Sequence, residues 1–267
     1  MRAIILAAGR GSRLHPYTAD CPKCLTELGG ETLIDRQLKV LRTCGVKDIT
    51  IVTGYRAEML NLPGTTQVIN DAWATTNMVE SLFVAEDLFD DDLIVSYSDI
   101  VYEHRVLNQL LNSTAETSVI VDKGWRSYWE FRFDDPLSDA ESLRMNEHGE
   151  ITDIGSKVTS IDEIEAQYIG LMRFNANGIR AMKSARCSMQ ENDRPWKYSR
   201  PVEKAYMTDL LMEMVLTGSK LNAVPVQNGW LEIDTISDFE TADTRFTDGS
   251  IVEFFDPDSD ISSPSRD

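Results

Sequence analysis

The sequence predicts an α/β fold with a mixed, mostly parallel central sheet flanked by helices and a β-hairpin inserted in its second half. Two observations carry this prediction. Over residues 1–121, short apolar runs with β-branched residues alternate with segments whose apolar residues recur at helical spacing. This pattern is typical of right-handed βαβ units. Further along the chain, two alternating runs flank His148-Gly149, a turn pair typical of a hairpin.

Five strands and three helices are expected in the first half. The apolar runs predict strands over residues 2–6, 48–53, 66–69, 92–96 and 117–121. Apolar residues three and four positions apart predict helices over residues 32–44, 78–88 and 104–111. Gly45 is expected to end the first of these helices.

The second half is expected to hold the hairpin, three more strands and three more helices. The hairpin spans residues 142–154, the strands 167–174, 221–226 and 230–233, and the helices 176–187, 205–216 and 235–242. No low-complexity linker separates the two halves. We therefore expect one domain over residues 1–249 and a polar, flexible tail over residues 250–267.

Composition narrows the class of protein. Of the 267 residues, 42% are hydrophobic and 26% charged, which is ordinary for a globular domain. The net charge of −18 argues against nucleic acid as a partner. No apolar run approaches the roughly 20 residues that cross a membrane, and we interpret the apolar N-terminus as a strand and not a signal peptide. A cytoplasmic protein without a membrane partner is expected.

Four cysteines are expected to be free thiols in a reducing compartment: Cys21, Cys24, Cys44 and Cys187. The first two have the C-x-x-C spacing of redox motifs. A zinc site needs a second ligand pair, which the sequence lacks. Redox and metal roles are therefore disfavoured for this pair.

The stretch after the first strand has the composition of a phosphate-binding loop. Glycines at positions 9 and 11 let a ligand approach the backbone, and a turned loop can aim its N–H groups at phosphate oxygens. Arg10, Arg13 and Lys23 add positive charge. The alternative is a dinucleotide fingerprint, but its third glycine position is Leu14 here.

Acidic residues follow two apolar strands. Ligands of parallel sheets bind beyond the carboxyl ends of the strands, where Gly9, Gly54 and Asp99 are expected. Asp234 follows a late strand in the same way. Such a carboxylate pair suits Mg²⁺, although each residue is also a candidate helix cap or loop charge.

The order G-x-G-x-R followed by Pro22-Lys23 resembles the signature of sugar-nucleotide pyrophosphorylases and small-molecule nucleotidyltransferases. Residues 76–82, 92–99 and 230–234 are similar to the phosphocholine cytidylyltransferase branch of that superfamily. Residues 125–129 and 135–142 are most similar to the phosphoglutamine cytidylyltransferases of capsular phosphoramidate synthesis. The resemblance covers the chain from residue 1 to about residue 246.

This resemblance implies a Rossmann-like nucleotidyltransferase fold that uses Mg²⁺ and releases pyrophosphate. The implied reaction transfers CMP from CTP to a small phosphorylated acceptor, with phosphoglutamine as the favoured acceptor. Phosphocholine, aminoethylphosphonate or a sugar 1-phosphate are alternatives. A homodimer is left open.

The resemblance also assigns roles. Asp99 and Asp234 would bind the metal, Arg13 and Lys23 would hold the departing pyrophosphate, and Lys157, in Ser-Lys-Val where the family has Glu-Lys-Pro, would contact the reacting phosphates. The implied nucleotide-binding residues are Leu6, Ala7, Ala8, Gly9, Arg10, Gly11, Ser12, Gly54, Tyr55, Asn77 and Ser81.

The acceptor side is expected to combine aromatic rings with charges of both signs. Aromatic faces attract cations, so the rings form either an acceptor wall or ordinary core. The candidate acceptor residues are Trp125, Arg126, Tyr128, Trp129, Glu203, Lys204 and Trp230.

Two functions of other classes remain as alternatives. Leu14, Arg10 and Arg13 disfavour a nicotinamide-dependent oxidoreductase. A non-catalytic nucleotide-sensing subunit is disfavoured because Asp99, Lys157 and Asp234 occur together, whereas binding alone needs no metal pair.

Overall fold

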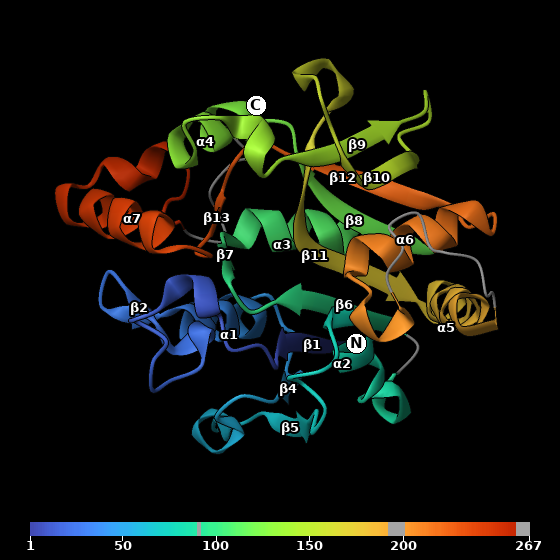
Figure 1. The fold of residues 1–267 in the computed structure, drawn as a ribbon, viewed down its shortest axis with the longest axis horizontal. Coiled ribbons are helices and arrows are strands. Elements are labelled where there is room, and N and C mark those ends of the chain that lie inside the picture. Colours follow the sequence, from blue (N-terminus) through green and yellow to red (C-terminus); the bar gives the residue numbers. More distant parts are fainter. Residues whose placement is uncertain (90–91, 192–200, 260–267) are drawn as a thin grey trace.

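A seven-stranded mixed sheet forms the centre of the computed structural model, which describes residues 1–89, 92–191 and 201–259. The strands follow one another in the order β12-β8-β11-β6-β1-β4-β5 (Figure 1). Their bounds are β1 Arg2–Ala7, β4 Asp48–Thr53, β5 Thr66–Ile69, β6 Asp92–Tyr97, β8 Thr117–Asp122, β11 Gln167–Asn175 and β12 Leu221–Val226.

Strand β11 is the one antiparallel member of this described sheet. It pairs antiparallel with both β6 and β8, whereas β1 runs parallel to β4 and β6, β4 to β5, and β8 to β12. The prediction of a mixed, mostly parallel sheet is confirmed. The carboxyl ends of β1, β4, β6 and β8 therefore lie along one edge, together with the amino end of β11.

Helices cover both faces of the sheet. Contacts place α1 Leu33–Thr43 and α3 His104–Asn112 on one face, and α2 Met78–Phe83, α5 Ala176–Glu191 and α6 Met207–Leu216 on the other. In Figure 1, α5 and α6 lie to the right of the sheet and α1 to the left. Successive residues of β1 point to opposite faces of the sheet. Ala3 and Ile5 pack in the core beneath α1, whereas Ile4 and Leu6 pack in the core on the face covered by α2, α5 and α6.

Local sequence explains why the helices begin where they do. The Thr32 side chain accepts a hydrogen bond from the Asp35 N–H at 3.1 Å and caps α1. Its apolar residues at helical spacing, Leu33, Ile34 and Leu38 among them, are buried against the sheet. The predicted helix over residues 32–44 is confirmed.

The predicted hairpin is also confirmed. Strands β9 Glu141–Met145 and β10 Ile151–Lys157 pair antiparallel beyond the edge of the main sheet. Gly149 has φ +75°, a left-handed conformation that glycine adopts without strain and that closes the tight turn.

Three short features were not expected. Strand β7 Ile100–Tyr102 pairs antiparallel with β13 Trp230–Glu232, away from the main sheet. A further helix, α4 Trp125–Arg132, lies next to α7 Ile236–Asp248 (Figure 1). A two-stranded ribbon, β2 Glu27–Leu28 with β3 Glu31–Thr32, completes the fold.

The structure corrects several boundaries. The helix expected over residues 235–242 is α7, which continues to Asp248, and the helix expected over residues 176–187 is α5, which continues to Glu191. The helix expected over residues 78–88 ends at Phe83 and is followed by a separate 3₁₀ turn over Glu86–Leu88. The expected flexible tail begins too early, because Ile251, Phe254 and Phe255 are buried in the core. Residues 260–267 of that tail lie outside the described residues. Within the described ranges, no helix is long and apolar enough to cross a membrane.

Candidate functional site

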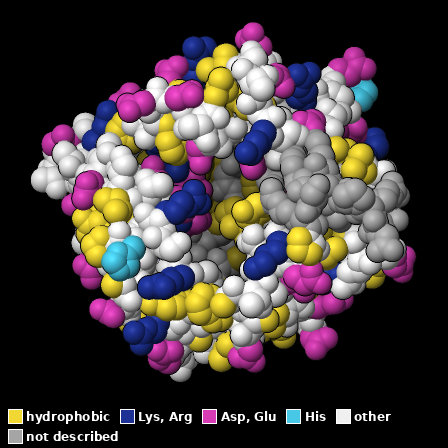
Figure 2. Space-filling view, in the orientation of Figure 1, with side chains coloured by type: hydrophobic (Ala, Val, Ile, Leu, Met, Phe, Trp, Pro, Cys, Tyr) yellow, Lys and Arg dark blue, Asp and Glu magenta, His cyan; other side chains and the backbone are white. Residues whose placement is uncertain are grey.

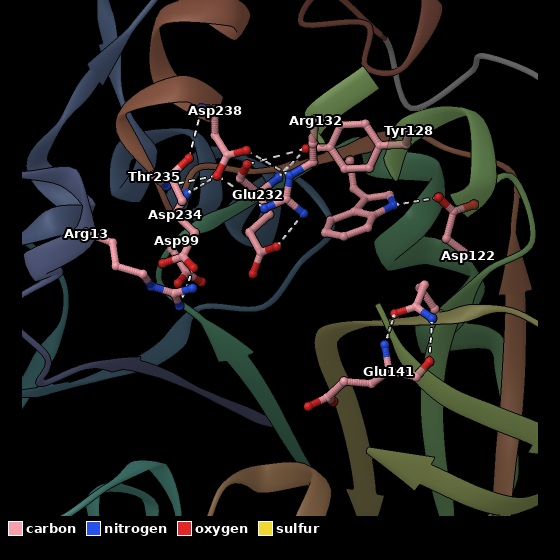
Figure 3. A network of polar contacts seen from close by, with 12 residues as sticks. Arg13, Asp99, Asp122, Tyr128, Arg132, Glu141, Glu232, Asp234, Thr235 and Asp238 are labelled. Atoms are coloured by element: carbon pink, nitrogen blue, oxygen red, sulfur yellow. Dashed lines mark hydrogen bonds and ion pairs between the residues drawn. The ribbon is translucent and has the colours of Figure 1, made fainter. Parts of the chain in front are cut away.

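The pairing of β7 with β13 brings Asp99 and Asp234 together. Asp99 comes directly before β7, and Asp234 comes two residues after the end of β13. The Ile233 N–H donates to the Asp99 carbonyl at 2.9 Å, which extends the ladder to the two acids. Figure 3 shows both carboxylates side by side with Arg13 next to them. The carboxylate pair expected from the sequence is therefore formed.

Lys23 lies between these carboxylates. Its Nζ is 2.7 Å from Asp99 Oδ2 and 2.6 Å from Asp234 Oδ1, and the residue is only 7% exposed. Burial by itself lowers the pKa of Lys23, but Asp99 and Asp234 outweigh it and the net pKa is raised. The lysine therefore stays charged at neutral pH. Arg13, which is largely exposed, forms an ion pair with Asp234 from the outer side.

The glycine-rich loop is shaped around Lys23. Gly11 has φ +68°, and a Cβ there would lie 2.7 Å from the Lys23 Cβ, so a larger residue would displace the lysine. Buried Thr18 donates from Oγ1 to the Gly11 carbonyl at 2.9 Å and fixes the turn. The 3₁₀ turn Ser12–Leu14 follows, with Leu14 in the core. Leu14 therefore packs in the core, at the position where a dinucleotide-binding turn would have its third glycine.

A cleft of about 280 Å³ opens above this cluster. Figure 2 shows the same face hollowed near its centre, with Lys and Arg side chains around the rim. The residues that line the cleft are Leu6, Ala8, Gly9, Gly11, Ser12, Arg13, Lys23, Trp73, Thr76, Asn77, Met78, Ser81, Ser98, Asp99 and Asp234. The structure thus brings most of the expected nucleotide-binding residues to one cleft.

The remaining nucleotide-side residues lie just behind the lining. The Tyr55 N–H donates to the Ala8 carbonyl at 3.0 Å, and the Arg10 guanidinium lies 5.4 Å from the centre of the Tyr55 ring. A Cβ on Gly54 would come within 2.5 Å of the Trp73 Cβ and 2.7 Å of the Ala8 carbonyl oxygen. Ala7 is buried in the core. Gly54 and Tyr55 therefore support the wall of the cleft.

Trp73 is a cleft residue that sequence reasoning missed. Its ring meets Tyr55 edge-on at 5.5 Å between centroids. Asn70, 2% exposed, holds the loop that carries it: its Oδ1 accepts from the Ala72 N–H, and its Nδ2 donates to Thr76 and Ser81, each at 3.0 Å. The Asn-Asp pair at the end of a strand was the available signal for a structured turn.

The carboxylates suit a divalent cation. Asp99 Oδ1 is buried and has no hydrogen-bond partner among the described residues, whereas its other oxygen contacts Lys23. Within the same part of the chain no cluster of three or more His, Cys, Asp or Glu forms a closed metal cage. Two carboxylates with the remaining positions left to water and phosphate oxygens are the donor set that Mg²⁺ accepts.

Of the two interpretations left open for the aromatic residues, the structure favours ordinary core. Trp125, Tyr128, Trp129 and Trp230 are all at most 4% exposed and belong to the core between α4 and β13. The Trp230 Nε1–H donates to Asp122 Oδ2 at 2.9 Å, and the Tyr128 hydroxyl accepts from the Glu232 N–H at 2.8 Å. Burial in this cluster leaves the rings no face for a ligand.

The charged acceptor candidates are placed differently. Arg126 lies on the exposed face of α4 and pairs with Glu130, four residues later. Glu203 and Lys204 are exposed on a 3₁₀ turn beside α2, where the Asn77 Nδ2 donates to the Lys204 carbonyl at 3.3 Å. Lys157 is exposed at the end of β10, opposite Glu141. None of these four residues lines the cleft described above, so their roles stay predictions.

The C-x-x-C pair forms no redox centre in the structure. Cys21 and Cys24 are both free thiols. Burial raises the pKa of Cys24 to about 12, so its thiol stays protonated and unreactive at neutral pH.

Comparisons with known proteins agree with this geometry. The MobA-like NTP transferase domain family matches residues 3–140. CTP:phosphoglutamine cytidylyltransferase of Campylobacter jejuni subsp. jejuni serotype O:2 is 38% identical over 252 residues, which are 90% of this chain and 98% of that protein. The chain belongs to this nucleotidyltransferase family. It is therefore an enzyme of the transferase class.

Other relatives of this nucleotidyltransferase match in fold or over shorter stretches. Choline-phosphate cytidylyltransferase of Streptococcus pneumoniae is 33% identical over 118 residues, 43% of this chain and 52% of that protein. The solved CTP:phosphocholine cytidylyltransferase from Streptococcus pneumoniae superimposes with a TM-score of 0.70 at 21% identity and covers 91% of this chain and 97% of that one. This last match supports the expected Rossmann-like nucleotidyltransferase fold.

Proposed function

We propose that this nucleotidyltransferase transfers CMP from CTP to phosphoglutamine and releases pyrophosphate. The observation that carries the proposal is the 38% identity to CTP:phosphoglutamine cytidylyltransferase along almost the full length of both chains. The relation to the choline-phosphate enzyme covers less than half of this chain. The sequence resemblance over residues 125–129 and 135–142 favours the same acceptor.

The geometry supports in-line displacement at the α-phosphorus. An acceptor phosphate oxygen forms the new P–O bond while the bond to the β-phosphate oxygen breaks, and the electron pair leaves with pyrophosphate. Such a reaction needs positioning and charge neutralisation more than covalent help from the protein. In this proposal Arg13 and Lys23 neutralise the departing pyrophosphate, and the N–H groups of residues 8–11 bind its oxygens.

Asp99 and Asp234 would hold the Mg²⁺ ion, which supplies charge neutralisation at phosphate oxygens when bound. The buried, unpartnered Asp99 Oδ1 supports this assignment. Lys23 keeps the two carboxylates at a fixed separation in the folded protein. Metal and triphosphate would then meet at one end of the same cleft.

The base and the acceptor are assigned to different walls. Asn77 and Ser81 line the cleft together with Trp73, and we assign this wall to cytosine. An amino-acid acceptor carries both a carboxylate and an ammonium, so its site needs both signs of charge. One such pair, Glu203 beside Lys204, lies next to the cleft residue Asn77.

Steady-state kinetics over a matrix of substrates test the proposal. We expect the highest kcat/KM for CTP with phosphoglutamine, and much lower values with ATP, GTP or UTP. Phosphocholine and aminoethylphosphonate, each with CTP, are the competing acceptors. A kcat/KM for phosphocholine above that for phosphoglutamine would contradict the acceptor assignment and leave the nucleotidyl transfer itself in place.

A further inference from the structure

We infer that Arg132 and Asp238 are positioning residues that fix the direction of the Asp234 carboxylate. The inference rests on the proposed function in one respect, namely that Asp234 is a metal ligand. Neither residue lines the cleft, and both are buried. Figure 3 shows Arg132 joined to both Glu232 and Asp238, on the same side of the site as Asp234.

Asp238 holds the backbone at Asp234. Its Oδ2 accepts the Asp234 N–H at 3.1 Å and the Thr235 N–H at 2.8 Å. Asp238 is the third residue of α7, and its own N–H donates to Thr235 Oγ1 at 3.1 Å, which completes a capping box. A capping box needs the Thr235 bonds alone. The additional bond to the Asp234 N–H restrains Asp234, which lines the cleft, whereas Thr235 and Asp238 do not.

Arg132 holds Asp238 in turn. Its guanidinium binds both carboxylate oxygens, with Nε 3.0 Å from Oδ1 and Nη2 3.2 Å from Oδ2. Its Nη1 lies 2.7 Å from Glu232 Oε2, so one buried side chain contacts both Glu232 at the end of β13 and Asp238 in the first turn of α7. A planar guanidinium fork fixes the direction of a carboxylate, which an ammonium does not.

Aromatic rings keep the guanidinium in place. Its central carbon lies 5.4, 5.2 and 4.8 Å from the ring centres of Tyr128, Trp129 and Phe133. The core rings of α4 thereby acquire a role in the site, although they contact no ligand. They hold Arg132, which holds Asp238, which holds the Asp234 backbone.

Metal binding provides the test, because a purely structural pair would not change it. Arg132→Lys keeps the charge without the fork, and Asp238→Asn keeps an acceptor oxygen for the cap. Arg180→Lys, at an exposed position of α5 with no assigned role, is the matched control. Mn²⁺ binding is measured by electron paramagnetic resonance with and without CTP, melting temperature reports folding, and kcat is followed as a function of Mg²⁺ concentration.

We expect Mn²⁺ to bind at least about tenfold more weakly in both variants, as is usual when residues behind a metal ligand are changed. We expect kcat to fall at low Mg²⁺ and to recover at saturating Mg²⁺, while KM for CTP at saturating Mg²⁺ changes little. Because the two residues act as a unit, the double variant should bind Mn²⁺ no more weakly than the weaker single variant. Arg180→Lys should behave like the wild type.

A lowered melting temperature with unchanged Mn²⁺ affinity in both variants would overturn the inference and leave the pair as a helix cap. Equal Mn²⁺ affinity in the wild type and in Asp234→Ala would overturn the inference as well. Failure of the proposed function gives a different result. In that case Mn²⁺ binding depends on Asp234 and weakens in both variants, but the protein releases no pyrophosphate from CTP and phosphoglutamine. That result would support the positioning role and refute the proposed reaction.

Discussion

The backbone N–H of Ile233 donates to the carbonyl oxygen of Asp99 at 2.9 Å. This bond continues the β7–β13 ladder by one step and joins two segments that are far apart in the sequence. Ile233 directly precedes Asp234 in the chain. The ladder therefore also fixes the backbone position from which the Asp234 side chain extends. The Asp99–Asp234 pair is thus placed by backbone hydrogen bonds and not only by contacts of its own side chains.

Asp99→Ala and Asp234→Ala should each lower kcat at least about a hundredfold, because each removes a carboxylate that holds charge-neutralising metal at the reacting phosphates. Circular dichroism should show an unchanged fold. Asp87→Ala, at an exposed position outside the cleft, is the control and should retain full activity. Turnover within tenfold of wild type in both site variants would refute the metal assignment.

Arg13→Ala and Lys23→Ala should each weaken the use of CTP, since each removes a charge-assisted contact worth about 1.5–3 kcal/mol. Initial rates at varied CTP measure the effect. Cys21→Ser and Cys24→Ala serve as neighbouring controls and should retain activity, because neither thiol has an assigned role. An inactive pair of cysteine variants beside an active Lys23→Ala enzyme would show that the C-x-x-C segment carries the chemistry.

Trp73→Ala should weaken CTP binding by about 1–3 kcal/mol, the usual range for loss of a base-stacking ring, whereas Trp73→Phe should retain most of the affinity. Gly54→Ala should act in the same direction, because its Cβ would meet the Trp73 side chain and the Ala8 carbonyl oxygen. Calorimetric titration with CTP measures all three variants. Unchanged affinity in Trp73→Ala would place the base elsewhere in the cleft.

Trp230→Ala should lower the free energy of unfolding by about 3–5 kcal/mol, as expected for truncating a buried Trp. Urea denaturation measures this loss. In the fraction that remains folded, the KM for the acceptor should stay within a few-fold of wild type, because the ring is core and not acceptor wall. A large rise in the acceptor KM with little loss of stability would restore the original interpretation of the aromatic residues.

Several elements could be predicted from local sequence because their patterns have one dominant cause. Residues 66–69 form the expected strand β5, and Thr32 caps the expected helix α1. The candidate phosphate-binding loop was recognisable from its two glycines and the cations near them, and the structure adds that Gly11 has a positive φ beside Lys23. These features depend on backbone conformation and short-range spacing, which the sequence displays directly.

Other features depend on what the fold brings together. Trp125, Tyr128, Trp129 and Arg132 occur at i, i+3, i+4 and i+7, the spacing of a buried helix face, whereas the aromatic character of the first three left a ligand wall and ordinary core equally open. The helical spacing of these residues was the better indication of their burial. The contacts of Lys23 with both Asp99 and Asp234 had no local signal, because three segments far apart in the sequence create them.

Phosphorus NMR of wild-type protein incubated with CTP, phosphoglutamine and Mg²⁺ tests the central claim most directly, because it follows both products of the proposed transfer in one spectrum. The account predicts pyrophosphate and a CMP-linked acceptor in equal amounts, with no turnover when the acceptor or Mg²⁺ is omitted. Hydrolysis of CTP without the linked product, or no reaction with this acceptor under saturating conditions, would contradict it.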